Sequence, residues 1–181
     1  LLVLIMLLFL FSMLSPAQAA TLTVGPTGSH ATIGHAIAAA ASGDRIEVAG
    51  GTYTENLDLS GKDLDIVGAG PSLTILSPPT SGFGVVVYDQ GEAGSLEGFG
   101  IEPASGERGI YILNSSPRIV NCRIEGAGDY DSTWGGAVSV SNGSPEFENV
   151  EFIDTMGAKG GDLYIAGSSN VQLSDSTIDG S

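Results

Sequence analysis

The sequence predicts an all-β fold, a parallel β-helix of stacked coils that is closed at its N-terminal end by a short α-helix. Three observations carry this prediction: a motif that recurs at a nearly constant spacing, apolar residues that alternate within short runs, and turn-forming residues between the runs. Units of this kind cannot each bury their own apolar row, so they must stack on one another. The spacing is too short for the blades of a β-propeller, which need about 40 residues or more.

The repeat is clearest in the segment 116–124, which reads Ser-Pro-Arg-Ile-Val-Asn-Cys-Arg-Ile. It recurs 28 residues later, at 144–152, as Ser-Pro-Glu-Phe-Glu-Asn-Val-Glu-Phe. Shorter copies lie at 96–101 and 173–178, with offsets of 23 and 26 residues. Stacking would align the apolar residues in two buried rows, Leu96, Ile119, Phe147 and Leu173 in one and Ile101, Ile124, Phe152 and Ile178 in the other.

A second segment repeats between these copies. It reads Gly-Ile-Tyr-Ile at 109–112 and recurs at 136–140 and 161–165, with 84–87 as an earlier member. Apolar residues alternate within these runs, which is the period of a strand with one buried face. Gly, Ser, Asn and Pro cluster between the runs, as turns require.

A polar position separates the two apolar rows in each copy. It is occupied by Gly98, Asn121, Asn149 and Asp175. We interpret it as an internal turn column in which Asn amides stack and bond along the solenoid, the alternative being a series of plain surface turns. The same register predicts opposite charges on neighbouring coils, Arg118 beside Glu146 and Arg123 beside Glu151.

The segment before the repeats has a different pattern. Residues 21–24 are expected to form a first strand, and apolar residues then recur at helical spacing: Ile33, Ala36, Ile37, Ala40 and Ala41. Thr32 is the predicted N-cap and Gly43 the predicted C′ residue. Because a terminal coil exposes its apolar interior, this helix is the predicted lid of the solenoid.

The composition excludes several classes of protein. Six Lys and Arg against 21 Asp and Glu give a net charge of −15, which leaves no electrostatic footprint for nucleic acid and repels anionic membrane surfaces. The chain has a single cysteine, Cys122, so neither an internal disulfide nor a thiolate zinc site can form, and a buried apolar role is expected for it.

The first residues are typical of export. Residues 1–14 form an uncharged apolar run, and an Ala-x-Ala pattern at Ala17 and Ala19 follows it, so residues 1–19 are predicted to be a secretory signal peptide rather than a membrane anchor. The strand and capping helix are assigned to residues 20–43, and the coils to residues 44–181. The last coil stops midway, so we expect a fragment of a longer solenoid that lies outside the membrane, secreted or at the cell surface. Nothing in the sequence indicates an oligomeric state.

The residues 24–28, 51–56 and 66–70 read Val-Gly-Pro-Thr-Gly, Gly-Thr-Tyr-Thr-Glu-Asn and Ile-Val-Gly-Ala-Gly. This pattern resembles the opening of pectin methylesterases and related right-handed parallel β-helix proteins. The resemblance implies a right-handed, pectin lyase-like solenoid, and it extends to many proteins of this fold that are not enzymes.

The later coils resemble the repeats of polymorphic outer-membrane proteins, which carry a Gly-Gly-Ala-Ile element and a Phe-x-x-Asn element. Gly135-Gly136-Ala137-Val138 matches the first element, whereas the segment 152–155 has Thr155 where Asn is expected. The resemblance spans residues 134–165 and implies a surface-exposed solenoid used in adhesion.

The esterase resemblance implies one Asp as nucleophile, a second as acid or base, and a Gln for the oxyanion. The closest strand here, at 108–112, has neither Gln nor Asp, and the later strands offer only Asp162, which we interpret as a turn residue. We therefore expect no catalytic residues among these coils. The alternative is the N-terminal part of a polysaccharide lyase or pectinesterase-like enzyme whose active site lies beyond residue 181.

Two acidic residues are the candidate metal ligands. Glu102 and Glu125 fall in one outward column of adjacent coils and could share a Ca²⁺ ion, with Asp179 two coils further along. Ile153 interrupts the column, no Arg or Lys is expected nearby in register, and the alternative is a solvated acidic face. Asp129 and Asp131 are a second Ca²⁺ candidate, and no other cofactor is indicated.

Tyr130 and Trp134 are the candidate ligand-binding residues, because a loop that carries flat aromatic faces can stack on a sugar ring. The alternative is loop packing onto the coil. His30 and His35 have the wrong spacing for one metal, and the sequons at Asn114 and Asn142 are explained by turn chemistry. The sequence thus favours an exported, non-catalytic β-helix that binds polysaccharide or a surface protein and does not bind nucleic acid.

Overall fold

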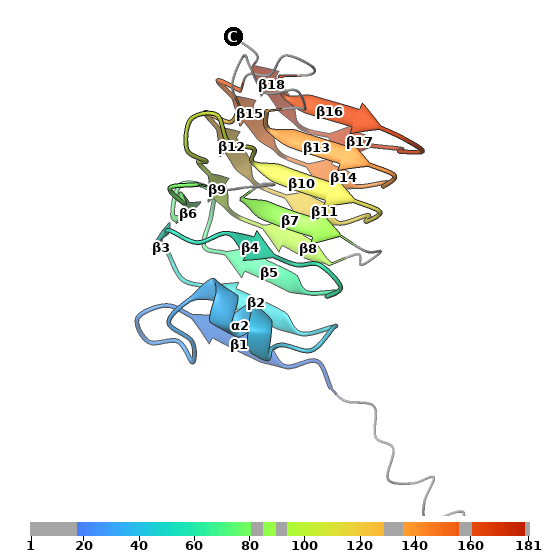
Figure 1. Ribbon diagram of the computed structural model, residues 1–181. Helices are drawn as coiled ribbons and strands as arrows, with labels where there is room; N and C mark the ends of the chain where they lie inside the picture. The colour runs from blue at the N-terminus through green and yellow to red at the C-terminus, as the bar shows by residue number, and fades with distance from the viewer. Residues whose placement is uncertain (1–17, 81–84, 90–93, 129–135, 156–160, 180–181) are drawn as a thin grey trace, which may run out of the picture.

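The computed structural model describes residues 18–80, 85–89, 94–128, 136–155 and 161–179 (Figure 1). Residues 1–17 of the predicted signal peptide lie outside the described residues. Within the described part of the chain, no helix has the length and apolar character needed to cross a membrane.

Three parallel sheets, called here A, B and C, make up the solenoid. Sheet A contains β1 (Thr21–Val24), β2 (Arg45–Val48), β5 (Asp65–Gly68), β8 (Ser95–Glu97), β11 (Arg118–Val120), β14 (Glu146–Glu148) and β17 (Gln172–Ser174). Sheet B contains β3 (Gly51–Tyr53), β6 (Thr74–Leu76), β9 (Gly100–Ile101), β12 (Arg123–Glu125), β15 (Glu151–Ile153) and β18 (Thr177–Asp179). Sheet C contains β4 (Leu57–Asp58), β7 (Val86–Asp89), β10 (Ile110–Leu113), β13 (Val138–Ser141) and β16 (Leu163–Ala166).

The chain passes from sheet A to sheet B to sheet C and then returns to sheet A one rung further along, as Figure 1 shows. The winding is right-handed, the sense that parallel connections within one sheet almost always take. The molecule is therefore a right-handed parallel β-helix, and the predicted fold class is confirmed.

The register between coils also agrees with the repeat. Ile119 pairs with Leu96 on one side and with Phe147 on the other, and Phe147 pairs with Leu173. The first three side chains of this row are buried, whereas Leu173 on the last described coil is 40% exposed. Burial in each coil thus depends on the coil that lies against it.

The predicted turn column lies between sheets A and B. Gly98, Asn121, Asn149 and Asp175 all have positive φ, between 49° and 73°. Gly, Asn and Asp adopt this left-handed conformation most readily, which explains why the column admits only these residue types. Asn149 Nδ2 donates a hydrogen bond of 3.1 Å to Asn121 Oδ1, so the amides do bond along the solenoid as predicted.

The turns that lead from sheet C back to sheet A use the same backbone conformation. Asn114 and Asn142, the asparagines of the two sequons, have φ of 51° and 55°. This geometry supports the turn chemistry expected for them.

The cap of the solenoid is the helix α2 (Ile33–Ala39), which packs against β1, β2 and β4 at the N-terminal end in Figure 1. The Thr32 side chain accepts a hydrogen bond from the backbone N–H of His35, as predicted for an N-cap. The predicted C-terminal end is wrong. The backbone is already extended at Ala40, so Gly43 is not the C′ residue and Ala41 is exposed.

Two charged side chains of the first coil hold the ends of this helix. The Glu55 carboxylate accepts hydrogen bonds of 2.8 Å from the backbone N–H groups of both Ile33 and Gly34. At the other end, Lys62 Nζ donates to the carbonyl oxygens of Ile37 and Ala40. A carboxylate at the N-terminus and an ammonium at the C-terminus both match the helix dipole, so the lid is fixed to the coil beneath it.

The Glu55→Ala substitution should lower the free energy of unfolding by about 2 kcal/mol, because two helix N–H groups lose a charged acceptor. Glu55→Gln, which keeps one carbonyl acceptor, should have a smaller effect. Urea unfolding followed by circular dichroism measures both changes. Glu97→Ala, on the exposed face of β8, is the control, with an expected change within about 0.5 kcal/mol. Equal effects of Glu55→Ala and Glu97→Ala would contradict the capping role.

Candidate ligand-binding faces

The predicted Ca²⁺ ligands lie on the outward face of sheet B. Glu125 is on β12, and Glu102 directly follows the neighbouring strand β9, so their side chains leave adjacent coils in one column. This column continues through Ile153 to Asp179, as the register predicts. Within the described residues, no group of three or more His, Cys, Asp or Glu side chains comes together in a way that could hold a metal ion.

A guanidinium group lies between the two carboxylates. Arg123 Nη2 is 3.6 Å from Glu102 Oε1 and also contacts the Glu125 carboxylate. The expectation that no basic residue lies nearby in register is therefore wrong. Arg123 does pair with Glu151 in backbone register, but its side chain turns toward Glu102 and Glu125 instead. The guanidinium therefore already supplies the positive charge that a cation bound between these two carboxylates would supply.

Replacing this guanidinium tests the Ca²⁺ prediction. In the Arg123→Gln variant, Glu102 and Glu125 lose their positive neighbour, so Ca²⁺ should bind at least several-fold more tightly than to the wild-type chain. Isothermal titration with CaCl₂ measures the difference, and the triple variant with Glu102→Gln and Glu125→Gln added should lose the gain. An unchanged Ca²⁺ affinity in Arg123→Gln would show that these two carboxylates are not Ca²⁺ ligands.

A hollow of about 580 Å³ borders the same column. Its lining residues are Thr54, Ser77, Pro78, Pro79, Glu102, Pro103 and Ala104. Proline rings and two hydroxyl groups thus surround one side of Glu102, while Arg123 holds the other side. The Glu102 carboxylate in this hollow is already paired with Arg123.

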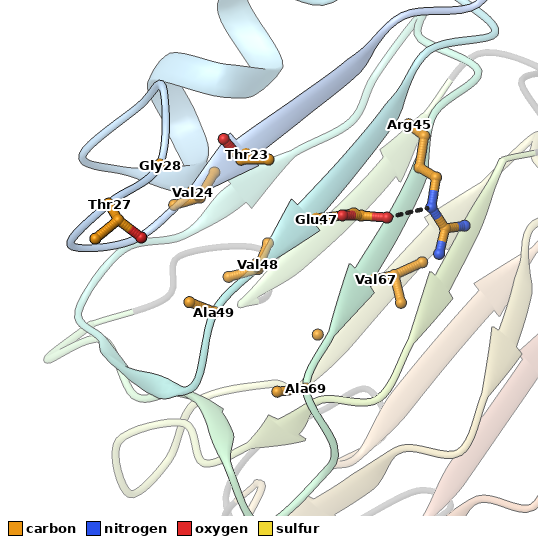
Figure 2. Close-up of a pocket in the computed structure, with 11 residues that line it drawn as sticks. Thr23, Val24, Thr27, Gly28, Arg45, Glu47, Val48, Ala49, Val67 and Ala69 are labelled. Carbon is orange, nitrogen blue, oxygen red and sulfur yellow. Dashed lines mark hydrogen bonds and ion pairs between the residues drawn. The ribbon is translucent and has the colours of Figure 1, made fainter.

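A second hollow, of about 410 Å³, lies on the outward face of sheet A near the cap (Figure 2). We call it the sheet A groove. It is lined by Thr23, Val24, Thr27, Gly28, Arg45, Glu47, Val48, Ala49, Val67, Gly68 and Ala69. Its floor is formed by successive strands β1, β2 and β5, and one side by the loop that follows β1.

Glycines allow this loop to fold back over the strand it leaves. Gly25 has φ of 137°, a backbone conformation that residues with a Cβ atom rarely adopt. At Gly28, a Cβ atom would lie 2.7 Å from the Thr23 carbonyl oxygen, which is too close for a larger residue. The loop is closed by hydrogen bonds between Thr23 and Ser29 and by a bond of 2.9 Å from His30 N to Thr23 O. These constraints place the partly buried Gly28 and the exposed Thr27 beside the sheet.

An ion pair forms the polar side of the groove. Arg45 Nε is 3.2 Å from Glu47 Oε1, and Figure 2 shows Glu47 extending across the sheet toward Arg45 with Val67 beside them. Both side chains are about half exposed, which leaves the pair accessible to a ligand. The groove therefore combines an apolar floor with one donor group and one acceptor group.

The outward face of sheet C carries a row of hydroxyl-bearing residues. Tyr111, Ser139 and Tyr164 pair in register on β10, β13 and β16. Their neighbours along each strand, such as Ile110 and Ile112, point into the buried core, so the row itself faces outward. Sequence reasoning missed this row, although both tyrosines stand at the same position of the repeated run.

A guanidinium stacks on one of these rings. The Arg108 guanidinium carbon lies 5.5 Å from the centroid of the Tyr111 ring, within cation–π distance. Ser139 is only 3% exposed although it faces outward. The two tyrosines are half-buried and lie two strands apart, about 9.6 Å at the usual strand spacing.

The single cysteine lies in the core, as expected. Cys122 is buried, and its Sγ donates weak hydrogen bonds to the carbonyl oxygens of Val120 and Leu96. Burial raises the pKa of the Cys122 thiol to about 12 and also raises the pKa of the buried Tyr88. A thiol held in its neutral form is a poor nucleophile, so Cys122 contributes packing rather than chemistry.

The raised pKa of Cys122 makes stability depend on pH. Above about pH 8.5 the unfolded chain releases this proton while the folded chain keeps it, so stability falls by up to about 1.4 kcal/mol per pH unit. The contribution of the buried, neutral Cys122 thiol to the free energy of unfolding is fully present below about pH 8.5. It is lost as the pH rises toward 12. Urea unfolding between about pH 7 and pH 10 should show a shallower decline for Cys122→Ala, which retains Tyr88. Parallel pH profiles would contradict the buried thiol.

The remaining candidate residues are less central. Tyr130 and Trp134, together with Asp129 and Asp131, lie outside the described residues. The Asp162 carboxylate accepts a hydrogen bond from the Thr155 hydroxyl group.

Comparison with known proteins finds a likeness among solved structures. No family model matches the sequence, and no curated protein matches it. Among solved structures, the chain is similar to the pectin methylesterase from Aspergillus niger in its deglycosylated form, with 16% identity, 90% of each chain covered and a TM-score of 0.41. A likeness at this level transfers no residue role, so the function must be argued from the faces of this solenoid.

Proposed function

We propose that this chain is an exported, non-catalytic segment of a secreted or cell-surface protein that binds a polysaccharide along its lateral faces. The observation that carries the proposal is the in-register row of Tyr111, Ser139 and Tyr164 on sheet C. Tyrosine offers an apolar ring face and a polar hydroxyl at its tip, which together match the C–H faces and hydroxyl groups of sugars.

The row also has the shape that a linear polymer requires. Its two tyrosines lie two strands apart, about 9.6 Å along the solenoid axis, so a polymer that follows the axis would meet a ring at each of these two coils, with the nearly buried Ser139 between them. Arg108 supports the Tyr111 ring from one side and restricts its motion. A rigid row loses little conformational freedom on binding.

The double substitution Tyr111→Ala and Tyr164→Ala should weaken binding to the recognised polysaccharide by about tenfold or more, because two rings are lost. Affinity electrophoresis in gels that contain cellulose derivatives, xylan, galactan or polygalacturonate measures the retardation. Val120→Ala, on the outward face of sheet A, is the matched control and should migrate like the wild-type chain.

Two outcomes would count against the proposal. Equal retardation of the wild-type chain and the double variant would remove sheet C from the binding face. Release of methanol or of unsaturated uronides from pectin, with or without Ca²⁺, would favour the enzymatic alternative over a non-catalytic binding segment.

A further inference from the structure

We propose that the sheet A groove is a separate binding site for a neutral sugar residue. This inference rests on the proposed polysaccharide binding and assigns one sugar to one place on the solenoid. Its volume of about 410 Å³ is within the range of ligand pockets, and it pairs an apolar floor with a small number of polar groups.

The groove differs from the rest of sheet A in one respect, which points to a ligand. An equivalent ion pair recurs on the same face, where Arg118 on β11 contacts Glu148 on β14. At the first coils, however, the folded loop with Thr27 and Gly28 adds to the lining beside the sheet, and the face there forms a hollow. The same charges are thus presented in a groove at Arg45 and Glu47, and on an open face at Arg118 and Glu148.

The polar groups of the groove still have bonding capacity. Arg45 meets Glu47 only through Nε, and in the described part of the chain no hydrogen bond is made by its two terminal nitrogens. Glu47 likewise uses one carboxylate oxygen for this contact. The groove can therefore donate from a guanidinium and accept at a carboxylate at the same time.

These groups define the chemistry of the occupant. One positive and one negative charge give the groove no net charge, so no charged ligand is selected. A sugar hydroxyl both donates and accepts, and the C–H face of the ring can rest on Val67, Ala49 and Ala69. A uronate is disfavoured, because its carboxylate would meet Glu47 on a chain whose net charge is −15.

A pair of matched substitutions tests the site. Val67→Trp fills the groove, whereas Val120→Trp places the same side chain at the equivalent outward position of sheet A, where the loop is absent. With cellohexaose, xylohexaose and mannohexaose as neutral probes in calorimetric titrations, Val67→Trp should weaken binding of the recognised oligosaccharide by about tenfold or more. Val120→Trp should bind it as the wild-type chain does.

A second pair keeps the shape of the groove and changes only its charge. Glu47→Gln should weaken neutral oligosaccharide binding by about tenfold, because an acceptor of charge-assisted bonds is lost, and Glu148→Gln should not. Equal affinities for Val67→Trp and Val120→Trp would overturn the site. So would stronger binding of oligogalacturonate than of the neutral probes.

The failure of this inference is distinguishable from the failure of the proposed function. If the double tyrosine variant loses polysaccharide binding while Val67→Trp retains binding of every oligosaccharide, the proposed sugar site in the sheet A groove is contradicted. The proposed binding of polysaccharide by the sheet C face is then supported. If the wild-type chain binds no polysaccharide and no oligosaccharide, both proposals fail. Thermal unfolding of each variant confirms that the compared proteins are folded.

Discussion

The structure depends on the in-register stacking of one coil on the next. A coil of this chain closes no core of its own, because each of its three strands contributes one or two inward side chains that a neighbouring coil must cover. Ile119 is buried between Leu96 and Phe147, whereas Leu173, with a covered side and an open side, is 40% exposed. Since a shift of one residue would turn every inward side chain outward, the register is fixed by burial rather than by the turns.

The turns nevertheless decide which residues can occupy the corners. The bend between sheets A and B consists of a single residue in the left-handed conformation, and this geometry is repeated in every coil from Gly98 to Asp175. An L-residue with a larger side chain is strained there by about 1–2 kcal/mol, so the corner selects Gly, Asn or Asp. The amide bond from Asn149 to Asn121 then adds a side-chain contact to the stack.

The backbone could be predicted from the sequence because a repeat carries its own register. The offsets of 28, 26 and 23 residues align the apolar rows without knowledge of any side-chain conformation. Outward side chains are not determined in this way. Arg123 has Glu151 as its register partner, yet its long side chain reaches Glu102 and Glu125 on the other side. Backbone register alone does not determine which neighbouring carboxylate a long arginine side chain will contact.

The contacts between the cap and the first coil could not be predicted from the sequence either, because the cap lies outside the repeat. Glu55 belongs to the Gly-Thr-Tyr-Thr-Glu-Asn pattern, but only the structure places it at the N-terminus of α2, 21 residues away from Gly34.

The separation between core and surface explains how such a fold can carry a binding function. Burial fixes only the inward residues, so the outward positions of each strand can vary without cost to the stack. Several of those on sheet A are charged, and Arg118 pairs with Glu146 and Glu148, which keeps this part of the face solvated. The sheet A groove lies where the repeat is interrupted. The loop after β1 is that interruption, because the cap must leave sheet A and return to it, and in doing so it encloses Arg45 and Glu47. The same element that closes the core thus gives the otherwise uniform face a distinct site.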